Sequence, residues 1–240
     1  MRKVASRKDV EQDVAGDLQT ALAALKHKSS KSTLAGMTRF GIPSDNALGV
    51  TVADIRTLAK QLGRNHGLAL ALWKTGVYEA RMLTAFVADP ARVTPSQMER
   101  WCRDFDNWAI CDTLCFHLFD RTPHAFAKVR EWSDRRAEFE KRAAFALLAS
   151  LAGHDKRSGD EPFVAALPLI ERAAPDERNF VKKGVSWALR RIGGRSRALN
   201  VAATELAERL IISPDGAARW IGRDSLREIT SSKVLDRLNG

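Results

Sequence analysis

The chain has 240 residues, of which 45% are hydrophobic and 28% are charged, and its 39 Lys and Arg against 29 Asp and Glu give a formal net charge of +10. That composition is typical of a folded globular protein and excludes a disordered one, while the positive charge favours a polyanionic partner. The longest charge-free apolar stretch, 143–152, is too short to cross a membrane, and no apolar segment follows the basic amino terminus. We therefore expect neither a membrane span nor a secretory signal.

Helical periodicity dominates the chain, and no run alternates as a strand would. Breaks at Gly, Pro, Ser and Asp clusters divide the pattern into segments. The predicted helices cover 8–26, 52–63, 66–75, 79–88, 95–104, 106–119, 123–131, 136–152, 161–172, 177–192, 197–211 and 215–230. Thr51, Thr94 and Ser213 are suitable N-caps for three of these helices. Residues 27–50 are expected to form an ordered loop with a short helix near 32–38.

Short helices joined by short loops predict antiparallel helix pairs that stack in a row. No sequence repeat is visible, so such a solenoid would be degenerate. No linker is long enough to separate two independent domains, and we expect one helical-repeat domain over 1–240.

The three cysteines, Cys102, Cys111 and Cys115, lie in one short stretch. An odd, clustered count does not suit a disulfide framework and indicates a reducing cytoplasm. Cys111 and Cys115 are one helical turn apart and close to His117, which is a weak zinc signal without a second matching pair. We expect buried packing for these side chains and no metal.

Positive charge concentrates between Arg178 and Arg197, where seven basic residues occur without an Asp or Glu. A helical wheel places the apolar stripe on Val181, Val185, Ala188 and Ile192. The residues expected to bind nucleic acid are Lys182, Lys183, Arg190, Arg191, Arg195 and Arg197.

Trp187 lies away from the apolar stripe of this segment, with basic residues one turn before and one turn after it. Two interpretations stay open. The ring is either wedged against the next helix under Lys and Arg stems, or presented to a nucleic-acid ligand among phosphate-binding cations.

Residues 105–119 form the next constellation, in which Trp108 and Asp112 share one helical face. The wheel adds to this face Phe105, Cys115, Phe116 and Phe119. A carboxylate on an aromatic stripe is costly to desolvate unless a cation or donors meet it. Asp112 therefore either caps or pairs with a neighbouring helix, or is held in a partly dry cleft to stabilise developing positive charge.

Arg142 stands at the head of a helix whose next ten residues carry no charge. It is either a surface residue whose stem lies along apolar neighbours or one arm of a buried ion pair.

Four segments together resemble the AlkD-type DNA alkylation repair glycosylases: GIPSDNALGVTVADIRTLAK, FDNWAICD, RAAFALLASLAGHDK and FVKKGVSWALRRIG. The resemblance extends from about residue 35 to 230. It implies an all-α fold, a curved α-solenoid of HEAT-like antiparallel helix pairs whose concave basic face holds duplex DNA.

The same resemblance implies an enzyme that excises cationic alkylated purines such as N3-methyladenine and N7-methylguanine. Asp112 matches the catalytic carboxylate, Trp108 and Trp187 match two aromatics beside the deoxyribose, and Arg142 matches the active-site arginine. The family commonly has an Asp directly after the first Trp, whereas this chain has Ala109.

We therefore expect a cytoplasmic, nucleoid-associated DNA glycosylase, monomeric and without a cofactor, whose partner is double-stranded DNA containing alkylated bases. No P-loop or dinucleotide fingerprint is present. One alternative is a non-catalytic helical-repeat protein that binds damaged or structured nucleic acid. Another is a protein–protein scaffold, for which an uninterrupted positive run has no use.

Overall fold

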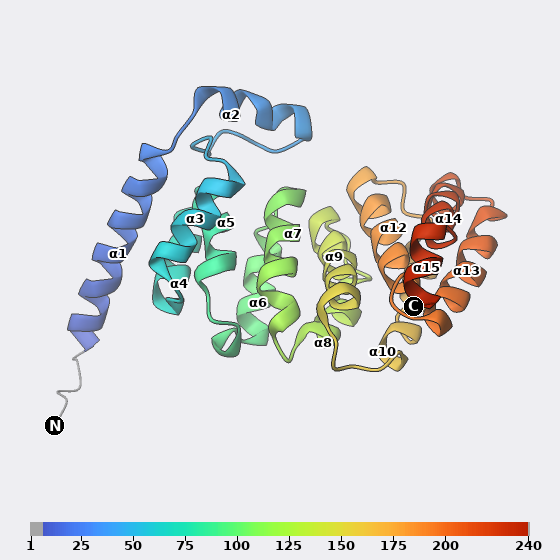
Figure 1. The fold of residues 1–240 in the computed structure, drawn as a ribbon. Helices are drawn as coiled ribbons and strands as arrows, with labels where there is room; N and C mark the ends of the chain where they lie inside the picture. The colour runs from blue at the N-terminus through green and yellow to red at the C-terminus, as the bar shows by residue number, and fades with distance from the viewer. Residues whose placement is uncertain (1–6, 240) are drawn as a thin grey trace. The chain divides into compact units, whose positions relative to one another are not determined.

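The structure is a computed structural model that describes the backbone of residues 7–239 and the side chains of residues 13–239. All regular structure in this range is helical, as the sequence predicted (Figure 1). The chain divides into two compact units, with the boundary between Val93 and Thr94. Within the described range, no helix is long and apolar enough to cross a membrane.

The first unit contains five α-helices and two short 3-10 turns in its described part. Helices α1 and α3 pack against α4 and α5, which pair with each other. The helix bounds are α1 Arg7–His27, α2 Lys31–Met37, α3 Val52–Leu62, α4 His66–Lys74 and α5 Tyr78–Val87, with turns η1 Thr38–Phe40 and η2 Pro90–Arg92. Helix α2 confirms the short helix expected near 32–38.

A buried carboxylate orders the loop before α3. The side chain of Glu79, which is fully buried, accepts backbone N–H bonds from Leu48, Gly49 and Val50 at 2.8, 2.7 and 3.1 Å. Gly49 has φ of 76°, and a Cβ there would collide with the Ser30 carbonyl. The Glu79 carboxylate therefore fixes the loop through its backbone N–H groups, and only glycine fits at position 49.

The second unit carries the remaining helices. They are α6 Pro95–Arg103, α7 Trp108–His117, α8 Ala125–Trp132, α9 Glu138–His154, α10 Glu161–Val164, α11 Leu167–Ala173, α12 Asn179–Gly193, α13 Arg197–Ile211, α14 Gly216–Ile229 and α15 Ser232–Asn239, with turn η3 Phe119–Arg121 between α7 and α8.

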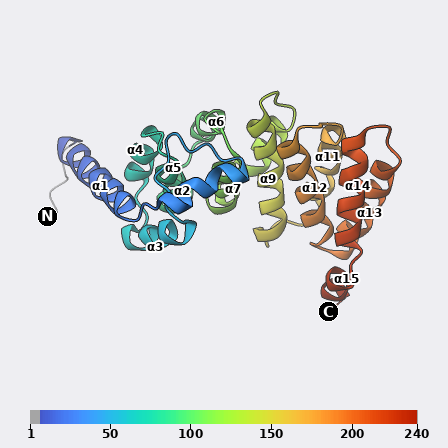
Figure 2. The ribbon, with the colours of Figure 1, turned by 90° about the horizontal axis from the view of Figure 1, so that it is seen from above.

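Two layers of helices build this unit. Helices α7, α9, α12 and α14 pack side by side in one row, and Figure 2 shows α9, α12 and α14 next to one another. Helix α8 pairs with α9, α11 with α12, and α13 with α14 behind that row. The predicted row of stacked helix pairs is confirmed for this unit.

The core lies between the two layers. Every residue of α9 from Arg142 to Ala152 is buried. On α12, the predicted apolar stripe of Val181, Val185, Ala188 and Ile192 is completely buried, which confirms the helical wheel. Thr51 and Thr94 cap α3 and α6 as expected, because their side chains accept N–H bonds from Asp54 and Gln97.

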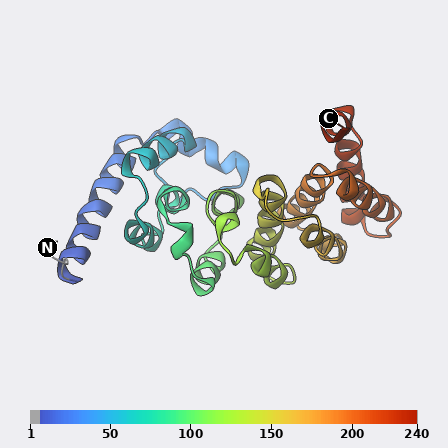
Figure 3. The ribbon, with the colours of Figure 1, turned by 60° about the horizontal axis from the view of Figure 1, so that its bottom comes forward.

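Three details of the sequence prediction were wrong. The predicted helix 161–172 is two helices, because Pro168 lacks the N–H that would bond to Val164 and instead occupies the first turn of α11. Ser213 does not cap α14, which begins at Gly216 after Asp215. The third is α15, which follows α14 after a short turn and projects from the end of the row (Figure 3).

Candidate functional site

The centre of the candidate site is an ion pair between α7 and α9. Arg142 donates from Nε to Asp112 Oδ1 at 2.9 Å and from Nη2 to Asp112 Oδ2 at 2.7 Å. Its third donor, Nη1, reaches the carbonyl of Phe180 at the start of α12, at 2.7 Å. The side chains of Arg142 and Asp112 are only 8% and 18% exposed. Of the two interpretations of Arg142, the buried pair is correct.

Burial and charge act against each other in this pair. Burial raises the pKa of the Asp112 carboxyl above its usual range, and the Arg142 guanidinium opposes that shift. For Arg142, burial lowers the pKa, but the Asp112 carboxylate more than offsets this effect, so the guanidinium stays charged. The bidentate contact fixes the orientation of the carboxylate.

Aromatic rings flank this carboxylate on α7. Trp108, partly buried, is one turn before Asp112 as the first residue of the helix, and Phe116 is one turn after it. Asn107 caps α7 by accepting the N–H bond of Ile110 at 3.0 Å. The cap sets where α7 begins, and thereby places Trp108 and Asp112 on the same face.

Trp187 reaches the site from α12. Its ring lies nearly parallel to the Phe116 ring, at an interplanar angle of 9° and a centroid distance of 5.2 Å. Trp187 is partly exposed, so it is neither fully in the core nor free in solvent. The structure thus brings together side chains from α7, α9 and α12 around Asp112.

The expected aromatic stripe on α7 is shorter than the sequence suggested. Helix α7 ends at His117, because Leu118 leaves helical geometry with φ of −136°. Phe119 therefore belongs to turn η3 and stacks with Trp101 at a centroid distance of 6.4 Å, buried together with Phe105. Of the aromatic residues assigned to that stripe with Trp108, only Phe116 remains partly exposed.

The three cysteines are buried, which confirms that prediction. Cys111 and Cys115 on α7 donate to the carbonyls of Phe139 and Ala143 on α9, at 3.7 and 3.5 Å. Their thiols thus help α7 to pack against α9 beside the ion pair.

Sequence analysis missed a buried acid next to Phe116. The Asp120 side chain, 1% exposed, accepts bonds at Oδ2 from Ser150 Oγ at 2.7 Å and from His154 Nδ1 at 2.6 Å. The His154 ring meets the edge of Phe116 with a centroid distance of 4.6 Å. This contact supports the Phe116 ring, and Trp187 stacks on the same ring. Asp120 and His154 are 34 residues apart, so no local pattern could have joined them.

The basic residues of α12 have different surroundings. Lys183 is exposed and has no acidic partner among the described residues. Lys182 lies over the ring of Trp220 on α14, with Nζ 5.0 Å from the ring centroid. Arg190 pairs with Asp224 and Glu228, both from α14. Positive charge that is uninterrupted in the sequence is therefore partly compensated in space.

Arg195 and Arg197 are engaged with backbone carbonyls. Arg195, with a side chain 10% exposed, donates to the carbonyls of Ala152, Asp155 and Ser158. Arg197 donates to the carbonyls of Leu238 and Asn239 at the end of α15, at 2.9 and 3.4 Å. Both side chains hold loops and helix ends in place, so these donors are already engaged within the protein.

A sequence model of the DNA alkylation repair enzyme family matches residues 21–229. The chain belongs to this family. Among solved structures, it is similar to one described as "a new family of proteins related to the HEAT-like repeat DNA glycosylases with affinity for branched DNA structures". The TM-score is 0.74 at 18% identity, over 88% of this chain and 94% of that chain, which establishes a common HEAT-like repeat fold.

A designed armadillo repeat protein also matches, with a TM-score of 0.34 at 12% identity over 82% of this chain and 100% of that chain. No curated protein sequence matches. The family match over residues 21–229 and the structural similarity with a TM-score of 0.74 confirm the family and the HEAT-like repeat fold that the sequence predicted.

Proposed function

We propose that the protein is a DNA glycosylase that releases cationic alkylated purines, such as N3-methyladenine and N7-methylguanine, from duplex DNA. The observation that carries this proposal is the partly exposed carboxylate of Asp112, held by Arg142 between aromatic residues. Family membership supports the same conclusion.

The chemistry needs little beyond these residues. An N-alkylated purine is cationic, and when its bond to C1′ of the sugar breaks, the electron pair leaves with the purine, which becomes neutral. Positive charge then develops on the sugar, and water adds to C1′ while releasing a proton. A carboxylate and electron-rich indole faces stabilise that charge.

Each side chain has a distinct part in this mechanism. Asp112 lies nearest to the sugar cation, and Arg142 positions its carboxylate. Phe116 covers one face of Trp187, so the other face is the one that meets the deoxyribose, opposite Trp108. Lys183, which is exposed on α12, contacts a phosphate beside this site.

The test is base release from methylated duplex DNA, with mass spectrometry of the freed purine. We expect N3-methyladenine and N7-methylguanine in the supernatant with the wild-type protein and a strongly reduced yield with Asp112→Asn. Equal yields from both proteins, or no release by either, would overturn the assignment.

One observation favours a second candidate, a non-catalytic protein that binds damaged or structured nucleic acid. Both oxygens of Asp112 already accept bonds from Arg142, and the residue after Trp108 is the buried, apolar Ala109. The similar solved structure is described as having affinity for branched DNA. Tight binding of a four-way junction, together with no release of any purine, would favour this candidate.

A further inference from the structure

Helix α15 and the carboxyl-terminal ends of α9, α12 and α14 line a solvent-open cavity of about 610 Å³. Asp112, Arg142 and Trp187 do not line it. Family similarity ends at residue 229, so α15 lies beyond the matched residues. Part of the cavity lining therefore comes from residues that the family model does not cover.

The lining of this cavity is strongly basic. Its one acidic residue is Glu228, which already pairs with Arg190. The cations that line it are Lys156, Arg190, Arg191, Arg195, Lys233 and Arg237. Such an excess of positive charge in a recess is unfavourable unless an anion enters it.

Arg191 is the side chain that most clearly lacks a partner. No acidic group or carbonyl accepts from its guanidinium within the described residues, and its Nε is buried without a hydrogen bond. The guanidinium lies directly over Gly153 of α9, where any Cβ would collide with Nη2. Because Gly153 has no side chain, the Arg191 guanidinium has space to lie against α9.

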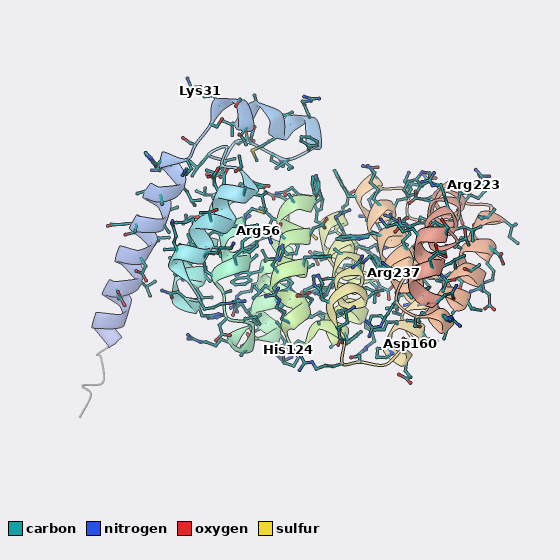
Figure 4. All side chains as sticks on the ribbon, viewed as in Figure 1. Lys31, Arg56, His124, Asp160, Arg223 and Arg237 are labelled. Atoms are coloured by element: carbon teal, nitrogen blue, oxygen red, sulfur yellow. The ribbon has the colours of Figure 1, made fainter. Side chains whose placement is uncertain are left out.

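Helix α15 supplies the opposite wall. Lys233 and Arg237 are four residues apart and so project from one face of the helix. Arg237, labelled in Figure 4, donates from Nη2 to the carbonyl of Gly194 at 2.8 Å, which ties α15 to the end of α12. Lys233 is exposed and has no acidic partner in the described part of the chain.

We propose that this cavity is a phosphate-binding pocket that holds a phosphate group of a DNA strand away from the Asp112 site. A guanidinium with free donors matches the oxygens of a phosphate, and the two lysines supply additional charge. The inference rests on the DNA-binding part of the proposed function, but not on base excision.

The experiment measures binding of a fluorescent blunt duplex, with and without a 5′-phosphate, by anisotropy over a range of salt concentrations. Arg191→Gln and Lys233→Gln each remove one charge from the pocket. Gly153→Ala keeps every charge and only displaces the Arg191 guanidinium. Arg172→Gln on α11 is the matched control, because Arg172 is exposed, does not line the cavity, and contacts the exposed Asp134 and the carbonyl of Pro168 on its own helix. Circular dichroism checks that each variant is folded.

We expect Arg191→Gln to weaken binding by roughly tenfold and to reduce the salt slope by about 0.9. Gly153→Ala should weaken binding although it retains the charge, and Arg172→Gln should change nothing. Equal losses with both duplexes would assign an internal phosphodiester to the pocket. A loss only with the 5′-phosphorylated duplex would assign a terminal phosphate.

Inorganic phosphate at constant ionic strength is the second probe. If the pocket accepts a free phosphate group, this ion should raise the melting temperature of the wild-type protein more than that of Arg191→Gln. If Arg191→Gln and Gly153→Ala bind both duplexes as the wild type does, the pocket assignment is overturned. Because excision is measured separately, a wild-type protein that binds DNA but releases no purine would overturn only the glycosylase assignment.

Discussion

Trp187 on α12 stacks against Phe116 on α7, with ring centroids 5.2 Å apart and the ring planes 9° from parallel. The contact holds the indole at one angle, with His154 and the buried Asp120 behind Phe116. A ring held in this way can meet a sugar without losing conformational freedom on binding.

Removal of the indole tests that role. Trp187→Ala should lower the rate of base excision by at least about tenfold, because one face that stabilises the sugar cation is lost. Its melting temperature should fall by less than ~5 °C, since the ring is only partly buried. Trp187→Phe is the matched variant and should retain part of the activity. If instead the melting temperature of Trp187→Ala falls further while excision per folded molecule is unchanged, Trp187 is a core residue.

Asp112→Asn keeps the shape of the side chain and removes its charge. The excision rate should fall by about two orders of magnitude, or ~2.7 kcal/mol, the scale of losing one electrostatic group in a transition state. Duplex affinity should stay constant or rise slightly, because a negative charge has been removed near phosphates. Single-turnover excision and a binding titration on one lesion duplex separate the two effects. Asp134→Asn, which changes a carboxylate whose side chain is 70% exposed, serves as the control.

The pH dependence of excision reports the charge of Asp112. The carboxyl is neutral below its pKa and ionised above it, and burial raises this pKa. Excision should therefore increase with pH, along a limb that lies above the ordinary range of an aspartate. Arg142 opposes the upward shift of the pKa, so Arg142→Gln should move the limb to higher pH. Rate profiles of the two proteins check this, and identical limbs would show that another group controls the rate.

Lys183 and Arg195 should respond differently to the same substitution. Lys183→Gln should reduce the slope of log K against log salt by about 0.9 without loss of stability, because its ammonium is exposed and no described acidic residue pairs with it. Arg195→Gln should leave that slope unchanged but lower the free energy of unfolding by roughly 2 kcal/mol, since its charged donors bond to three carbonyls. Salt titrations and urea unfolding of both variants decide the matter. A change of slope in Arg195→Gln would return this residue to the DNA-binding surface.

Local signals explain why most helices could be predicted. Apolar spacing and the caps at Thr51 and Thr94 act within a few residues, and the structure places those helices within one or two residues of their predicted bounds. Pro168 is an equally local signal, and it marks the break between α10 and α11 that the predicted helix 161–172 lacks.

Pairing between helices could not be predicted in the same way. Arg190 looked available for DNA because its acidic partner Glu228 lies 38 residues further along the chain. The ion pair of Asp112 with Arg142 was one of two open interpretations, since the packing of α7 on α9 decides it. The expected single domain with a concave basic face stays a prediction, as do the monomeric state and the cytoplasmic location.

Two of the polar contacts between α12 and α14 determine how these helices are aligned. Ser186 Oγ donates to Asp224 at 2.6 Å, and Arg190 pairs with Glu228, so both contacts join residues 38 positions apart and lie one turn from each other. Apolar side chains alone would tolerate a slide of one helix along the other by about 5.4 Å, one helical turn. Such a slide would separate both polar pairs at once, and the Asp224 carboxylate, whose side chain is 20% exposed, would keep only the bond from Arg227 on its own helix. These two contacts therefore favour one alignment of α12 with α14, although the repeats of the chain share no recognisable sequence.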